Sequence, residues 1–166
     1  MSYVEIYSVK PNGEVVGAFE VRNAMAGALF IWEHLREKYG VGSAFNYDPL
    51  WKLFTDDRMD LADKIVLGLT FDKVIIKREN LPPTVHALQK FISIHSTPTL
   101  VGIVDALAKL AEDPECMGVC FNHTSVAASY WEKWDEETDQ GRHYDLNADP
   151  GHWFLYDELP PEAAAF

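Results

Sequence analysis

Cys116 and Cys120 have a spacing that zinc sites use. Such sites combine a closely spaced pair of cysteines with a second pair of ligands, and His123 follows shortly after Cys120. Residues 117–121, however, form a short apolar run that is typical of a buried strand, and free cysteine is among the most buried residue types. We therefore expect two core thiols rather than metal ligands, and no cofactor.

A second group of polar residues, 122–125, reads Asn-His-Thr-Ser and lies where a strand is expected to end and a helix to begin. A hydroxyl beside an imidazole is the arrangement of an activated nucleophile, which makes His123 and Thr124 candidate catalytic residues. Ser and Thr also commonly cap a helix at such a position. The sequence contains no Gly-x-Ser-x-Gly motif and no glycine-rich phosphate loop. Capping is therefore the favoured interpretation, and catalysis at this junction is the alternative.

The segment 142–153 supplies the other residues that suit acid–base chemistry. His143 and His152 lie in it together with Asp145. Imidazoles beside carboxylates can exchange protons, and long polar loops in compact domains are often functional. The spacing matches no catalytic motif, so a capped turn at residues 149–151 is the simpler interpretation.

Almost all of the negative charge lies in the last third of the chain. Residues 112–166 hold 13 Asp and Glu but only two Lys and Arg, a net charge of −11, whereas residues 1–110 hold 13 acidic and 12 basic residues, a net charge of −1. Residues 160–166 contain a single carboxylate. The charge therefore belongs to segments that are expected to fold, and a partner would meet a shaped acidic surface.

The densest acidic stretch follows two tryptophans. Residues 130–139 read Tyr-Trp-Glu-Lys-Trp-Asp-Glu-Glu-Thr-Asp, and the sequence predicts a helix that begins at Thr124 or Ser125 and runs through Trp134. Trp131 and Trp134 would then share one helix face, and the carboxylates would oppose the helix macrodipole at a cost of about 0.3–1 kcal/mol each. We interpret that cost as a sign of a cationic partner, with a solvated helix face as the alternative. The residues expected to bind the partner are Trp131, Trp134, Asp135, Glu136, Glu137, Asp139 and Asp145.

Hydrophobic periodicity and turn residues predict the elements that position these groups. The expected strands are a hairpin over residues 3–9 and 15–21 and single strands over 71–78, 117–121 and 152–156. The expected helices are one that begins near Arg22 or Asn23 and stops at Gly40, one capped by Asp48, one over 57–67, an amphipathic helix after 81–84 and one from residue 99 to about 112 that follows a cap at Thr97. A polar loop is expected over 138–151. Strands and helices alternate only in part. We therefore predict one α+β domain, residues 1–159, with a mixed or antiparallel sheet of about five strands and several packed helices. Residues 160–166 are expected to form a short C-terminal tail.

Charge and composition exclude several classes of function. A net charge of −12 disfavours binding to nucleic acid, which relies on Lys and Arg contacts to phosphate, and docking to anionic membranes. No apolar run approaches the ~20 residues of a membrane span, and the N-terminus lacks the features of a signal peptide. Two cysteines exclude a disulfide scaffold, so we expect a cytoplasmic protein with reduced thiols.

Together, these observations predict a small acidic soluble protein that binds and neutralises a basic protein partner, as an immunity protein, antitoxin or inhibitor does. Complementary charge would speed the encounter with such a partner. A small enzyme that uses the 122–125 junction and the 142–153 loop is one alternative. A structural or oligomeric subunit, whose charge serves solubility, is another.

Overall fold

The first two strands form the hairpin that the sequence predicts. In the computed structural model, which describes residues 2–23, 27–123 and 128–165, β1 (Tyr3–Val9) pairs antiparallel with β2 (Glu14–Arg22). The turn closes where the Gly13 N–H donates to the Lys10 carbonyl at 2.9 Å and the Lys10 N–H donates to the Glu14 carbonyl at 2.8 Å. Strand-forming residues on either side of a Pro-Asn-Gly turn were sufficient to predict this unit.

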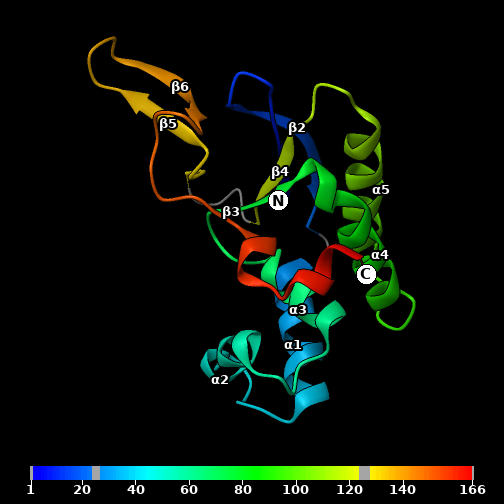
Figure 1. The fold of residues 1–166 in the computed structure, drawn as a ribbon. Coiled ribbons are helices and arrows are strands. Elements are labelled where there is room, and N and C mark those ends of the chain that lie inside the picture. The colour runs from blue at the N-terminus through cyan, green and yellow to red at the C-terminus, as the bar shows by residue number, and fades with distance from the viewer. Residues whose placement is uncertain (1, 24–26, 124–127, 166) are drawn as a thin grey trace.

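Within the described residues, this hairpin belongs to a seven-stranded sheet with the order β5-β6-β2-β1-β4-β3-β7 (Figure 1). The other strands are β3 (Val74–Lys77), β4 (Gly118–Asn122), β5 (Glu132–Asp135), β6 (Gln140–Asp145) and β7 (Trp153–Phe154). β3 and β7 pair in parallel, and the remaining neighbours pair antiparallel. The α+β class and the mixed sheet are confirmed. The expected number of about five strands is too low, because β5 and β6 replace a predicted helix and loop.

Helices pack against one face of the sheet and enclose the main core. They are α1 (Gly27–Tyr39), α2 (Asp48–Lys52), α3 (Leu61–Gly68), α4 (Leu81–Ile92) and α5 (Pro98–Glu112). Alternate residues of β1, Val4 and Ile6, point into this core, as expected for a strand with two different faces. Gly68 of α3 permits a close approach, because a Cβ atom at that position would lie 2.2 Å from a methyl group of Leu155.

Two predicted helix boundaries are confirmed and two are wrong. The Thr97 side chain accepts a hydrogen bond from the Leu100 N–H at 3.2 Å at the start of α5, and Gly40 follows α1 with φ of +63°. Asp48 does not cap α2, because Tyr47 occupies the cap position and Asp48 is the first helical residue.

The helix expected from residue 57 begins only at Leu61, as α3. The preceding residues form a turn in which the Asp56 carboxylate accepts the Arg58 backbone N–H at 2.9 Å. That carboxylate also accepts from the Arg58 guanidinium at 3.0 Å. A side chain that hydrogen-bonds its own neighbouring backbone competes with helix formation, which explains the later start.

The other face of the sheet carries a smaller, second core. Its buried members are Tyr7, Val9, Val15, Ile75, Cys120, Trp131 and Tyr144. Trp131 and Tyr144 are its largest side chains and are fully enclosed. The C-terminal segment therefore closes the face of the sheet that the helices leave uncovered.

The helix predicted through Trp134 is wrong. Residues 132–135 form β5, which pairs with β6 in a register that places Glu132 opposite His143 and Trp134 opposite Gly141. The start predicted for this helix, residues 124–127, lies outside the described residues. Aromatic residues suit strands, and pairing with β6 gives one side of this edge strand its backbone hydrogen-bond partners.

The rest of the C-terminal region also differs from the prediction, because β6 pairs with β5. The polar loop expected over 138–151 contains β6, and the strand expected over 152–156 shortens to β7, which is followed by a 3-10 helix (Leu155–Glu158). Residues 161–165 form another 3-10 helix in which Ala163 is buried in the main core. None of the helices in the described part of the chain has the length and apolar character needed to cross a membrane.

Candidate functional site

The β5–β6 hairpin extends away from the body of the protein, as the yellow and orange arm in Figure 1 shows. β6 joins the rest of the sheet through two residue pairs with β2, Glu14 with Asp145 and Val15 with Tyr144. Residues 132–135 pair with β6 alone. The hairpin is therefore anchored at its base and exposed along its outer part.

The two tryptophans of this segment lie in opposite environments. Trp131 is 1% exposed, donates its indole N–H to the Phe121 carbonyl at 2.9 Å and packs edge-on against Tyr144. Trp134 is 61% exposed. Side chains three positions apart on an extended chain point to opposite faces, so the shared face expected from a helix does not exist. Trp131 holds the base of the hairpin in the core, and Trp134 is presented to solvent.

The tip of the hairpin concentrates carboxylates. Asp135 accepts the backbone N–H of Glu137 at 2.9 Å and that of Thr138 at 3.4 Å, and these two hydrogen bonds hold the pKa of Asp135 below its usual value. Glu136, Glu137 and Asp139 are exposed, and no ion pair joins them to a cation within the described residues. Because the segment is a turn, the helix-dipole cost expected from the sequence does not arise.

Both basic side chains of the hairpin are engaged elsewhere. Lys133 and Arg142 are paired across β5 and β6. The Lys133 ammonium lies 3.9 Å from the centre of the Tyr130 ring, and the Arg142 guanidinium forms two hydrogen bonds with Asp149, at 2.7 and 2.8 Å. This contact lowers the pKa of Asp149 to about 2. The cations therefore stabilise the base of the hairpin and do not neutralise its tip.

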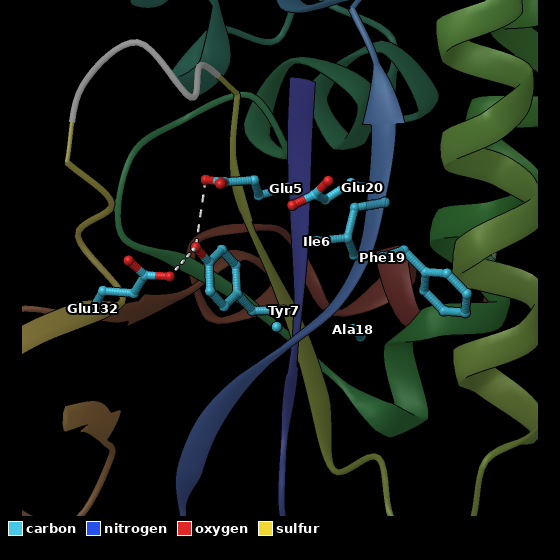
Figure 2. Close-up of a pocket in the computed structure, with 8 residues that line it drawn as sticks. Glu5, Ile6, Tyr7, Ala18, Phe19, Glu20 and Glu132 are labelled. Atoms are coloured by element: carbon cyan, nitrogen blue, oxygen red, sulfur yellow. Dashed lines mark hydrogen bonds between the residues drawn. The ribbon is translucent and has the colours of Figure 1, made fainter. Parts of the chain in front are cut away.

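Residues of the hairpin line two hollows. Glu132 and Trp134, two positions apart on β5, line a hollow of about 440 Å³ together with Lys133, Arg142 and His143. Glu132 also lines a pocket of about 280 Å³ that lies over β1 and β2 (Figure 2). Glu132 lines both the hollow at Trp134 and this pocket, so the two lie next to each other at β5.

The pocket over β1 and β2 is acidic. Glu5 and Glu20 are directly opposite each other across the two strands, an arrangement of like charges that destabilises a sheet. The Tyr7 hydroxyl donates weakly to Glu5 and to Glu132, at 3.4 Å each, and burial is the main cause that raises the pKa of Tyr7 to about 12 (Figure 2). Asn122 donates to Glu5 at 2.6 Å. The sequence did not reveal this group, because its members are joined only by strand register.

The candidate catalytic histidines have separate environments in the structure. His123 stacks on Phe121 and contacts the Leu69 carbonyl through Nε2 at 3.0 Å, and burial lowers its pKa and favours the neutral ring. His152 contacts the Tyr144 hydroxyl through Nδ1 at 2.8 Å. His143 is exposed on β6. Among the described residues, no hydrogen bond or ring contact links these three rings, and Thr124 lies outside that part of the chain.

The remaining predicted residues have structural contacts. Cys116 is buried in the main core and Cys120 in the second core, so the two thiols lie on opposite faces of the sheet. In the described part of the chain, no cluster of three or more His, Cys, Asp or Glu side chains is arranged to hold a metal ion. Asp145, expected to bind the partner, accepts the Asn147 N–H at 2.8 Å within a turn near Gly13.

Comparison of the chain with protein-family models, with curated proteins and with solved structures found no match.

Proposed function

We propose that this protein binds a basic protein partner through the β5–β6 hairpin and neutralises it, as immunity proteins, antitoxins and inhibitors do. The observation that carries the proposal is Trp134, a large aromatic side chain that is 61% exposed on a projecting hairpin. Tryptophan is among the residues that contribute most to binding energy at protein interfaces. A partner that covers Trp134 would remove its apolar surface from water, which is favourable for binding.

The charge around Trp134 defines the chemistry of the partner. The tip carries Asp135, Glu136, Glu137 and Asp139, and Glu132 precedes Trp134 on the same face. The opposed carboxylates of Glu5 and Glu20 extend this acidic surface into the neighbouring pocket. Trp134 lies between Glu132 and the carboxylates of the tip, with Lys133 and Arg142 in the same hollow. An aromatic anchor beside an acidic tip suits a surface rich in Lys and Arg, where the anchor supplies affinity and the carboxylates supply rapid association.

Replacement of Trp134 tests the anchor. We expect Trp134→Ala to weaken the complex with a basic partner, isolated by pull-down at low salt, by about 30-fold, the effect of losing an interface hot spot. The matched control is Phe45→Ala, since Phe45 is 86% exposed and precedes α2 in the chain. Helix α2 lies at the opposite end of the molecule from the hairpin (Figure 1). Equal affinities of the wild type and Trp134→Ala would contradict the proposal.

Neutralising the tip tests the role of its charge. The variant Glu136→Gln, Glu137→Gln, Asp139→Asn should associate about tenfold more slowly with the basic partner, and the difference should shrink as salt rises from about 50 to 300 mM. Stopped-flow association kinetics measure this. The control removes the same charge elsewhere, at the exposed residues Asp57, Glu79 and Glu115. If both triple variants slow association equally, net charge and not the hairpin steers the partner.

A further inference from the structure

A cavity of about 230 Å³ lies among the helices, between α1, α3 and α4. Its apolar wall includes Leu35, Ala62, Ala87 and Phe91, each of which is at most 6% exposed. A dry cavity of about 150 Å³ with such a lining is sufficient to bind a benzene ring. This cavity therefore has room for one ring or a short branched chain together with a small polar group.

The polar groups at the cavity are mainly cationic or able to become so. His34 of α1 and His95, in the loop between α4 and α5, stack with ring centres 3.9 Å apart and an angle of 23° between their planes. Lys38 and Lys90 also line the cavity. The lining of this cavity holds two lysines, two histidines and one carboxylate, so it is richer in basic side chains than the protein as a whole, whose net charge is −12.

The one carboxylate among the residues that line this cavity is already engaged. Asp63 accepts hydrogen bonds from the Lys38 ammonium at 2.6 Å and from the Tyr39 hydroxyl at 2.5 Å. Lys38 also reaches Asp60, at 3.3 Å. The Lys38 ammonium is therefore shared between two carboxylates and offsets the charge of only one of them, so His95 is the group at this cavity that receives an anion.

We propose that this cavity binds a small monocarboxylate with an aromatic or branched apolar body of about the size of benzoate. The apolar body lies against Leu35, Ala87 and Phe91, and the carboxylate accepts a hydrogen bond from His95 at the edge facing the lysines. Apolar walls with a few polar groups that fix orientation are the usual composition of a small-molecule site. The site is separate from the β5–β6 hairpin and does not depend on the function proposed for it.

His95 gives the site a dependence on pH. Burial, followed by the neighbouring His34, lowers the pKa of His95, so the free protein holds a neutral ring at neutral pH. The charged groups that act on His95 are Glu37 and Lys38 of α1 and Asp63 of α3, and Lys90 of α4 lines the same cavity. A bound carboxylate favours the protonated ring, so binding takes up a proton and strengthens as the pH falls.

The test uses benzoate and its neutral analogue benzyl alcohol, titrated into the protein of residues 1–166 and followed by calorimetry and by imidazole NMR signals. We expect benzoate to bind at least about tenfold more tightly than benzyl alcohol, the contribution of a charge-assisted hydrogen bond. We also expect its Kd to fall about tenfold between pH 7.5 and pH 5.5, where benzoate remains ionised. Equal binding of both compounds, a Kd that does not change with pH, or no binding at about 10 mM would each overturn the proposal.

Two variants test whether benzoate binds in this cavity and whether His95 recognises its carboxylate. Ala87→Leu fills the cavity and should abolish binding of both compounds, with the circular dichroism spectrum showing that the fold is retained. His95→Phe keeps an aromatic ring beside His34 and Phe91 and should remove the preference for benzoate and its pH dependence while benzyl alcohol still binds. His143→Phe, at an exposed position on β6, is the control. Unchanged preference for benzoate in His95→Phe would refute the assigned role of His95, whether or not Ala87→Leu folds.

Discussion

Replacing Trp131 with alanine should lower the free energy of unfolding by about 3–5 kcal/mol, the usual cost of removing a large aromatic side chain from a core. Trp131 is 1% exposed and is among the largest fully buried side chains of the protein. Its removal also leaves the Phe121 carbonyl without the indole N–H that it accepts at 2.9 Å. Urea denaturation followed by circular dichroism measures the loss.

The matched control for Trp131→Ala is Trp134→Ala. The two residues have the same chemistry and lie three positions apart, but Trp134 is exposed, so its replacement should change stability by less than about 0.5 kcal/mol. For partner binding we expect the larger effect from Trp134→Ala, because Trp134 is the proposed anchor. If the two alanine variants were equally stable, the second core would not be what holds the hairpin to the sheet.

The parts of the fold that local rules determine could be predicted from the sequence. The first hairpin follows from strand formers around a turn, the start of α5 from the Thr97 cap, and the end of α1 from Gly40. In each case the residues that decide the structure are neighbours in the chain. The α+β class follows from the mixture of such elements.

The C-terminal hairpin could not be predicted, because two structures fit its local pattern. A spacing of three places Trp131 and Trp134 on one face of a helix and on opposite faces of a strand. Pairing with residues 140–143 and the contact of Trp131 with Phe121 decide between them, and both are distant in sequence. The sequence therefore showed where in the chain the acidic residues concentrate, but the predicted helix gave them the wrong arrangement in space.

Two sites could not be predicted, because their residues are brought together by strand register or by the packing of separate helices. Glu5 and Glu20 are neighbours only because a bulge in the β1–β2 pairing places Ile6 opposite Phe19 and Tyr7 opposite Gly17. The stack of His34 on His95 joins residues from α1 and from the loop after α4. Each of these residues alone has an unremarkable sequence context, and only the tertiary structure brings them together.

Arg78→Met should lower the free energy of unfolding by about 2–4 kcal/mol, because it leaves carbonyls at the end of α5 and in the turn that follows without a charged donor. The Arg78 guanidinium donates to the carbonyls of Ala111 at 3.2 Å and Cys116 at 2.8 Å, and also to that of Asp113. Carbonyls at a helix C-terminus lack partners within the helix and carry the negative end of its dipole. A single planar side chain, from the residue that follows β3, thus holds the turn that leads from α5 into β4.

Geometry as well as charge determines this contact, so Arg78→Lys should recover only part of the loss. Lysine keeps the positive charge but lacks the planar fork that reaches carbonyls on several residues at once. Arg58→Met is the matched control, since Arg58 is exposed and forms a surface ion pair with Asp56, whose loss should change stability by less than about 1 kcal/mol. Thermal and urea unfolding of the three variants measure these differences. Full recovery by Arg78→Lys would show that the charge alone, and not the arrangement of donors, holds the end of α5 in place.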